Sequence, residues 1–320
     1  MLRNDLSMHT AASASFKVAQ LTQLVDQVST IIVGKREQVT LAVVCLLASG
    51  HLLIEDVPGV GKTTLSQALA RALGLSFSRI QFTSDLLPSD LLGVSVYERQ
   101  KEDFVFHPGP VFAQVLLADE INRAGPRTQS ALLEAMEERQ VSVDGETRPL
   151  PSPFFVIATQ NPSDQLGTHP LPESQLDRFA MRLSLGYPDP AAERALLTGE
   201  DRRITLTQMQ PMMNLAQWQQ CQAQVEQVHV ADNLLDYLQS LITATRDGRW
   251  FALGLSPRAG LSLLKLARAR ALLLGRGHVS PEDIHALWVP AVAHRLISLP
   301  QSGRSAQAQA RALLDITPVP

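Results

Sequence analysis

The stretch from Leu53 to Thr64 combines the residue types that hold a nucleotide phosphate. An apolar run leads into a glycine-rich loop, a lysine and two threonines. Glycines let main-chain N–H groups turn inward around a phosphate, Lys62 can reach its outer oxygens, and the hydroxyl of Thr63 can ligate Mg²⁺ at the start of the next helix. The residues expected to bind the phosphates are Pro58, Gly59, Val60, Gly61, Lys62, Thr63 and Thr64.

One position departs from the usual phosphate-loop pattern, because Asp56 stands where the first glycine is normally found. Aspartate is among the residues that best tolerate a positive φ, so the loop can form if this carboxylate points away from the phosphates. Taken alone, the segment is also compatible with an ordinary turn.

Two adjacent carboxylates, Asp119 and Glu120, follow an apolar run that begins at Val115. Successive residues of a strand point to opposite sides, so the two acids are expected to do different work. Asp119 would hold Mg²⁺ through water or together with Thr63, and Glu120 would orient and polarise an attacking water. A buried strand capped by solvated acids is the alternative, and the preceding phosphate loop disfavours it.

Three further polar residues stand at places where a phosphate could be touched. Asn161 follows the apolar run Phe154–Gln160, and its amide could contact the γ-phosphate or the lytic water, although Asn-Pro alone indicates only a turn. Arg178 precedes another apolar run and could equally form a surface pair with Asp177. Arg258 lies in the first turn of a long predicted helix and, by itself, would be taken as a surface residue.

The order of these motifs resembles that of an AAA+ ATPase, and the residues within the motifs resemble those of the MoxR family closely. The resemblance extends from about Ile31 to the C-terminus and includes the phrases Ile32-Val33-Gly34 and Pro108-Gly109-Pro110-Val111-Phe112. It implies that Asn161 is sensor 1, that Arg178 is an arginine finger donated to a neighbouring subunit, and that Arg258 is sensor 2.

The apolar runs alternate with helical segments, which predicts an α/β P-loop core with a five-stranded parallel sheet. Ligands bind outside the carboxyl ends of such strands, so all the nucleotide residues are expected on one rim. The predicted strands are His51–Glu55, Ser76–Phe82, Val115–Asp119, Phe154–Gln160 and Ala180–Leu185.

Three domains are expected along the chain. Residues 1–30 form an N-terminal helical or extended segment, residues 31–188 the AAA+ core, and residues 189–320 an all-helical lid without strands. In the lid, Arg258 is expected to face the nucleotide. The predicted lid helices are Asn233–Thr245, Arg258–Leu274 and Pro281–Leu296.

Two hairpins distinguish this core from a plain P-loop domain. One pairs Gly93–Tyr97 with Asp103–His107, and the other lies within Glu138–Leu150, where Asp144-Gly145 is a strong two-residue turn signal. They resemble the helix-2 insert and the pre-sensor-1 hairpin of the AAA+ branch that holds MoxR proteins, magnesium chelatase motors and replicative helicases. The second hairpin mixes acids with arginines, which disfavours tracking along a nucleic-acid backbone.

The composition fits a soluble cytoplasmic protein. The 320 residues carry a net charge of −3, which does not indicate broad binding to nucleic acid. The polar start lacks the apolar core of a signal peptide, and no apolar run approaches the roughly 20 residues needed for membrane insertion. Cys45 and Cys221 are far apart and are expected to be buried thiols.

These features predict a Mg²⁺-dependent ATPase that works as a ring, expected to be a hexamer, and remodels a client protein. The family resemblance suggests clients with von Willebrand A domains. A metal-chelatase motor, a small-molecule kinase and a nucleotide-gated scaffold with little hydrolysis are alternatives. A GTPase is disfavoured because the Asn-Lys-x-Asp base-recognition motif is missing from the sequence.

Overall fold

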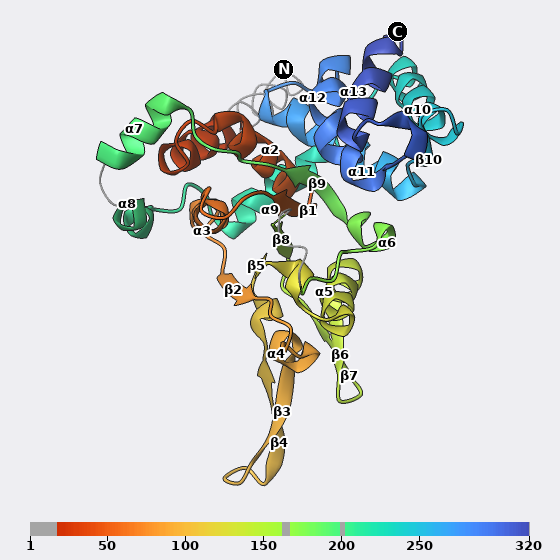
Figure 1. Cartoon of the computed structure of the whole chain (residues 1–320). Coiled ribbons are helices and arrows are strands. Elements are labelled where there is room, and N and C mark those ends of the chain that lie inside the picture. The colour runs from red at the N-terminus through yellow and green to blue at the C-terminus, as the bar shows by residue number, and fades with distance from the viewer. Residues whose placement is uncertain (1–17, 162–166, 199–201, 320) are drawn as a thin grey trace, which may run out of the picture.

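The computed structural model describes residues 18–161, 167–198 and 202–319, and a five-stranded parallel sheet lies at its centre (Figure 1). Its strands are β1 (His51–Glu55), β2 (Phe77–Gln81), β5 (Val115–Asp119), β8 (Phe155–Gln160) and β9 (Phe179–Leu183). Their order in the sheet is β2-β5-β8-β1-β9, and every neighbouring pair is parallel. The predicted fold class and the five predicted strands are confirmed.

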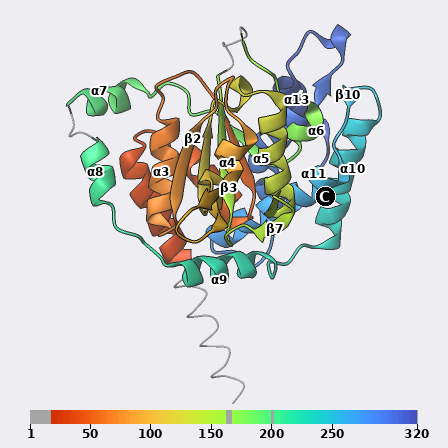
Figure 2. The same cartoon turned by 90° about the horizontal axis from the view of Figure 1, so that it is seen from below.

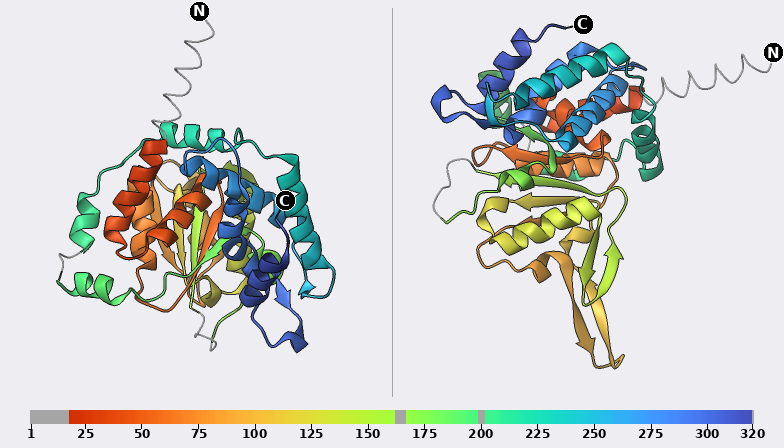
Figure 3. Two further views of the ribbon diagram at one scale, coloured as in Figure 1. Left: turned by 90° about the horizontal axis from the view of Figure 1, so that it is seen from above. Right: turned by 90° about the vertical axis from the view of Figure 1, so that its right-hand side faces the viewer.

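Side chains of the central strands alternate between two apolar cores. On β5, Val115 and Leu117 join the larger core, whereas Leu116 and Ala118 join the smaller one. This alternation follows from the pleat of a strand. The larger core is covered by α2 (Arg36–Leu47), α3 (Lys62–Ala72) and α9 (Leu215–Val225), and the smaller one by α4 (Pro88–Leu92) and α5 (Pro126–Glu138). The sheet therefore lies between two layers of helices (Figure 3).

The larger core also takes in residues outside the expected sheet domain. Residues 18–31 include a helix whose Leu21, Leu24 and Val28 are buried there. Cys45 and Cys221 are buried free thiols in the same core, as predicted, and burial raises the pKa of Cys45 to about 12. Within the described part of the chain, no helix has the length and apolar character needed to cross a membrane.

After β9 the chain passes through α7 (Pro190–Thr198) and α8 (Arg202–Gln208), which lie outside α3, and returns through α9 to the lid (Figure 2). The lid is built from α10 (Asp232–Arg246), α11 (Pro257–Leu273), α12 (Pro281–Val292) and α13 (Ala306–Ile316). In this lid, α11 packs on α2 and α12 packs on β9. The lid is thus attached to the helical layer over the larger core.

The expectation that no strand follows residue 188 is wrong. Strands β10 (Phe251–Leu253) and β11 (Ile297–Ser298) pair antiparallel inside the lid. They are 3 and 2 residues long, which is too short for apolar alternation to reveal them in a sequence.

Both predicted hairpins are present and extend away from the sheet (Figure 1). One pairs β3 (Gly93–Glu98) with β4 (Asp103–Pro108), and the other pairs β6 (Gln140–Val143) with β7 (Glu146–Pro149). Asp144 and Gly145 both have positive φ, as a tight two-residue hairpin turn requires. The guanidinium carbon of Arg148 on β7 lies 4.0 Å from the centre of the Phe106 ring on β4, so the two hairpins contact each other.

Short elements complete the fold. They are η1 (Pro110–Phe112), η2 (Ile121–Arg123), α6 (Glu173–Leu176), η3 (Ala293–Arg295) and η4 (Pro300–Ser302).

Candidate active site

The loop between β1 and α3 has the geometry of an anion site. Gly59 and Gly61 adopt φ values of +83° and +96°, and a Cβ on either would meet no atom within 4 Å. Glycine is therefore required there by backbone conformation, and crowding plays no part. Gly61 is also the N-cap of α3, so the free N–H groups and the positive end of that 11-residue helix meet at the loop.

Asp56 does not need the positive φ that was considered for it, since it is absent from the positive-φ residues of the described chain. Its carboxylate accepts hydrogen bonds from the backbone N–H of Val57 (2.8 Å), from the Ser184 hydroxyl (3.1 Å) and from the backbone N–H of Gly186 (2.6 Å). The side chain thus points toward the segment after β9, as the loop requires, and fastens the start of the loop to that segment.

Lys62 is buried, and its ammonium group lies at the junction of three polar groups. It donates to the carbonyl oxygen of Asp56 (2.6 Å) and to Oδ1 of Asn161 (2.6 Å), with the carbonyl of Gln160 at 3.5 Å. The structure therefore brings together the predicted lysine and the predicted amide, which are 99 residues apart in the chain.

Asp119 is buried at the carboxyl end of β5 and is held on both oxygens. The hydroxyl of Thr159 donates to Oδ1 (2.6 Å), and Arg79 on the neighbouring β2 pairs with Oδ2 (2.6 Å). Neither partner was singled out in the sequence, since each comes from a different strand and no motif contains it.

Glu120 leaves the strand altogether, with φ +56° and ψ +49°. A non-glycine residue in this left-handed region costs about 1–3 kcal/mol, which the surrounding contacts must offset. Its carboxylate accepts from Asn161 Nδ2 (3.2 Å) and Gln81 Nε2 (2.9 Å) and pairs with Arg123 Nε (2.9 Å). The two acids therefore have different partners, as expected, but a backbone turn as well as strand alternation separates them.

Mg²⁺ prefers oxygen ligands and is usually bound by one or two carboxylates together with phosphate oxygens. Thr63 at the start of α3 and Asp119 on β5 supply such oxygens, and α3 packs against β5. Thr63 and Arg79, the partner of Asp119, also line one shared cavity. Within the described residues, no cluster of three or more acidic, histidine or cysteine side chains offers a metal site without a nucleotide.

A cavity of about 410 Å³ adjoins the phosphate loop, and this volume suits a nucleotide base. Its lining comes from residues 31–35, from the phosphate loop and from residues 186–197, and it includes the charged side chains of Lys35 and Glu193. Lys35 Nζ donates to the carbonyl of Tyr187 (2.7 Å), which joins residues 31–35 to the segment after β9. The side chains of this lining include Ile31, Ile32, Val33, Val60, Tyr187, Leu196 and Leu197. In the sequence, Ile32-Val33-Gly34 stands out only as a motif shared with the family and Val60 only as part of the phosphate loop, so this cavity was not predicted.

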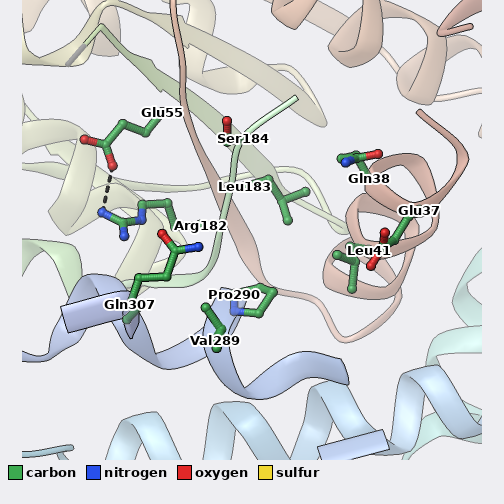
Figure 4. Close-up of a pocket in the computed structure, with 11 residues that line it drawn as sticks. Glu37, Gln38, Leu41, Glu55, Arg182, Leu183, Ser184, Val289, Pro290 and Gln307 are labelled. Atoms are coloured by element: carbon green, nitrogen blue, oxygen red, sulfur yellow. Dashed lines mark hydrogen bonds and ion pairs between the residues drawn. The ribbon is translucent and has the colours of Figure 1, made fainter. Parts of the chain in front are cut away.

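A second cavity, of about 380 Å³, lies between the sheet and the lid and has a different character (Figure 4). Its charged lining consists of Glu37, Glu55 and Arg182, and Glu55 pairs with Arg182 at 2.7 Å. One net negative charge and no glycine loop make it unsuitable for phosphates.

Arg178 and Arg258 do not lie on the rim that carries Lys62. Arg178 immediately precedes β9, at the amino edge of the sheet, and Arg258 lines the same 340 Å³ cavity there. The expectation that all nucleotide residues share one rim is wrong, and so is the expectation that Arg258 faces the phosphate loop of its own chain. Side-chain contacts at the start of α11 explain this position.

The first of these contacts is made by Asp177. It accepts a hydrogen bond from Ser256, the N-cap of α11 (2.9 Å), and pairs with Arg295 Nε (2.9 Å). Burial lowers the pKa of Arg295 to about 10, so it stays charged at neutral pH. Asp177, the residue before Arg178, thereby connects the sheet domain to the lid through Ser256 and Arg295. The second contact is a 2.6 Å ion pair between Arg258 and Glu137.

Comparison with known proteins agrees with this geometry. A model described as "ATPase family associated with various cellular activities (AAA)" matches residues 51–181, and an AAA lid domain model matches residues 243–315. The chain is 44% identical to the uncharacterized protein YeaC of Bacillus subtilis, over 94% of this chain and 95% of YeaC. It is 41% identical to Chaperone MoxR1 of Mycobacterium tuberculosis, over 90% of this chain and 78% of that protein.

A crystal structure from Cytophaga hutchinsonii, described as that of a candidate ATPase, is similar throughout. The TM-score is 0.89 at 33% sequence identity, and the match covers 98% of this chain and 99% of the other.

Proposed function

This chain belongs to the MoxR-type AAA+ ATPases, and from that premise we propose that it hydrolyses ATP with Mg²⁺ in a cytoplasmic ring, taken to be a hexamer, to remodel or activate a client protein. One observation carries the proposal. Lys62, Asp119, Glu120 and Asn161 converge on the carboxyl rim of the sheet, whereas two arginines face away at the opposite edge.

On the rim, each residue acts on a different part of the reaction. The loop amides and Lys62 bind the β- and γ-phosphates, and Asp119 with Thr63 would hold Mg²⁺, which neutralises phosphate charge when bound. Glu120, fixed by Gln81 and Arg123, orients the attacking water. Asn161 bridges Lys62 and Glu120 and so senses the γ-phosphate from between them.

The two arginines are assigned to the neighbouring subunit. A strand of five residues such as β9 is about 15 Å long, which is more than an arginine side chain can span from the amino edge to its own phosphate loop. We therefore place Arg178, as arginine finger, and Arg258, as sensor 2, at the γ-phosphate of the adjacent subunit. A chain with half a site on each edge hydrolyses ATP only after assembly.

The client side of the proposal rests on the family. MoxR1 carries the name chaperone, and the resemblance suggests clients with von Willebrand A domains. The two projecting hairpins also fit the motor subunit of a metal-chelatase complex, which is the second candidate. A scaffold that binds ATP without hydrolysis is disfavoured because Glu120 is present and held in place. A von Willebrand A protein encoded beside this chain would favour the chaperone.

Mixed rings test the assignment. Arg178→Ala and Glu120→Gln proteins should each lose hydrolysis, since removal of an arginine finger costs about 10³–10⁵ in kcat. Where an Arg178→Ala subunit receives the finger of a Glu120→Gln neighbour, one intact site forms. Mixing the two inactive proteins should therefore restore phosphate release in proportion to such interfaces. Full activity of Arg178→Ala alone, or no recovery although mass photometry shows mixed rings, would remove the proposed trans role.

A further inference from the structure

At the amino edge, Arg178 and Arg258 are both held by one helix, α5. Arg258 Nη2 donates to Glu137 Oε1 at 2.6 Å, and Arg178 Nε lies 3.9 Å from Glu137 Oε2. Arg178 Nη1 also donates to the carbonyl oxygen of Leu133, one turn earlier on α5. Glu137 is therefore the carboxylate that the two arginines share.

The cavity around Glu137 is lined by more cations than acids, so its carboxylate is needed to balance charge. Five cations line the cavity, but only two acids do, Glu137 and Asp177. Asp177 is committed to Arg295, which leaves Glu137 between the two guanidinium groups. Like charges this close repel each other, and a carboxylate between them offsets the repulsion and fixes their direction. The cations are Arg139, Arg178, Arg258, Lys265 and Arg295.

The solvent exposure of these three side chains indicates that their ion pairs affect where the arginines point more than they affect folding stability. The exposed side-chain fractions are 33% for Glu137, 49% for Arg258 and 29% for Arg178. Ion pairs this accessible contribute little to folding stability, because solvent screens them. Loss of the Glu137 carboxylate should therefore leave the subunit folded and disturb chiefly where the arginines point.

We propose that Glu137 is a positioning residue for ATP hydrolysis in the neighbouring subunit, acting through Arg178 and Arg258. It holds both guanidinium groups at the amino edge in the direction that the adjacent γ-phosphate requires. The inference rests on the proposed trans role of the arginines. It assigns work to a residue that touches neither the nucleotide nor Mg²⁺.

Glu137→Ala should lower kcat by about 10- to 100-fold, because a displacement of about 1 Å at a reacting group can cost 10² in rate. The KM for ATP should change by less than about twofold, since the phosphate loop of the same chain is untouched. Glu137→Gln keeps an oxygen acceptor for Arg258 and should lose less. The matched control is Glu138→Ala, which removes the adjacent exposed acid of α5 and should leave kcat unchanged. Equal losses in both alanine variants would overturn the proposal.

Two mixtures distinguish positioning from a general structural defect. Glu137→Ala subunits have an intact phosphate rim, so Glu120→Gln subunits should rescue them, whereas Arg178→Ala subunits should not. The reverse pattern would place Glu137 at its own site and overturn the inference alone, provided that Arg178→Ala and Glu120→Gln rescue each other. If that reference pair fails, the trans role falls and this inference with it. Mass photometry of each mixture verifies that rings contain both variants.

Discussion

The two edges of the central sheet are built differently. On the carboxyl rim, Lys62, Asn161 and Glu120 form a continuous chain of hydrogen bonds, and each charge has a partner of fixed geometry. On the amino edge, Arg178 and Arg258 converge on Glu137 through partly exposed side chains. The rim gathers the proposed nucleotide residues in defined contacts, while the cavity at the edge is lined by more cations than acids.

This difference indicates which edge of the sheet can change its side-chain geometry more easily. Backbone turns and mostly buried side chains define the rim, so its groups are held in place by short-range contacts. Long arginine side chains define the edge, so its geometry depends on the carboxylates that hold them. Variants of the two edges should consequently fail in different ways, and four predictions test this from the largest expected effect to the smallest.

Substitutions on the rim should have the largest effects, and they should cause two different defects, loss of ATP binding and loss of hydrolysis. Lys62→Ala should abolish ATP binding because Lys62 pairs with ground-state phosphate charge. Glu120→Gln should keep ATP bound and slow hydrolysis by at least about 10²-fold, because it acts on the water. Equilibrium binding of a fluorescent ATP analogue and phosphate release separate the two. The control Lys101→Ala, on the exposed turn after β3, should alter neither. A Glu120→Gln protein that cannot bind ATP would contradict the role given to that carboxylate.

On the amino edge, the largest effect should be on folding. Asp177→Asn leaves the buried guanidinium of Arg295, whose side chain is 3% exposed, without its carboxylate. Removing one partner of a buried ion pair costs about 3–5 kcal/mol. Urea unfolding should report a loss near the lower end, since Asp177 is 18% exposed. Asp247→Asn, which removes the acid from the exposed pair with Arg249, should have little effect. Equal stability of Asp177→Asn and the parent protein would show that Asp177 does not join lid and sheet.

The rim could be predicted from the sequence because its residues stand in contiguous motifs at the ends of strongly apolar strands. Parallel strands bring those ends together without any knowledge of distant contacts. The loop from Pro58 to Thr64 and the pair Asp119 and Glu120 therefore lie where expected.

The amino edge could not be predicted in the same way. The start of α11 is fixed by the contact of Ser256 with Asp177, 79 residues away, and by that of Arg258 with Glu137, 121 residues away. Side-chain pairs over such distances leave no periodic trace in one sequence. The same holds for Arg79 beside Asp119.

A pH dependence should also separate the two edges. His51, in the amino-edge cavity, accepts from the backbone N–H of Val156 (2.9 Å), and its Nε2 lies 3.3 Å from the carbonyl of Met136. Burial, and then the charge of Arg139, lowers the pKa of His51 to about 4. The unfolded chain, with a histidine pKa near 6.5, binds the proton first.

Stability should therefore be complete above about pH 6.5 and fall as the pH drops toward 4, by about 2 kcal/mol between pH 7.5 and pH 5. Burial also lowers the pKa of His294, which acts in the same direction. Urea unfolding at the two pH values measures the change. His51→Gln should flatten it and the exposed control His107→Gln should not. An unchanged slope in His51→Gln would mean that other groups set the acid limit.

The smallest predicted effect concerns a contact between the two hairpins, which lie outside the sheet. Helix α5 carries Glu137 and leads directly into the β6–β7 hairpin. Arg139 ends the helix with a positive φ, and its carbonyl accepts from the backbone N–H of Leu150, the residue after β7. The β3–β4 hairpin follows β2, whose Gln81 contacts Glu120 on the rim. Arg148 stacks on Phe106 and so joins the two hairpins.

Arg148→Ala should remove about 0.5–1 kcal/mol of folding stability, the usual contribution of an exposed cation–π contact. Basal ATP hydrolysis should stay within about twofold, because Arg148 touches neither edge directly, while client stimulation of hydrolysis should fall if the hairpins move as one unit. Arg148→Lys keeps a cation over the ring and should fall between, and Arg99→Ala at the exposed β3–β4 turn is the charge-matched control. If clients still stimulate hydrolysis by Arg148→Ala, the contact between the hairpins is not needed for this stimulation. Each hairpin would then act independently on the edge of the sheet to which it is connected.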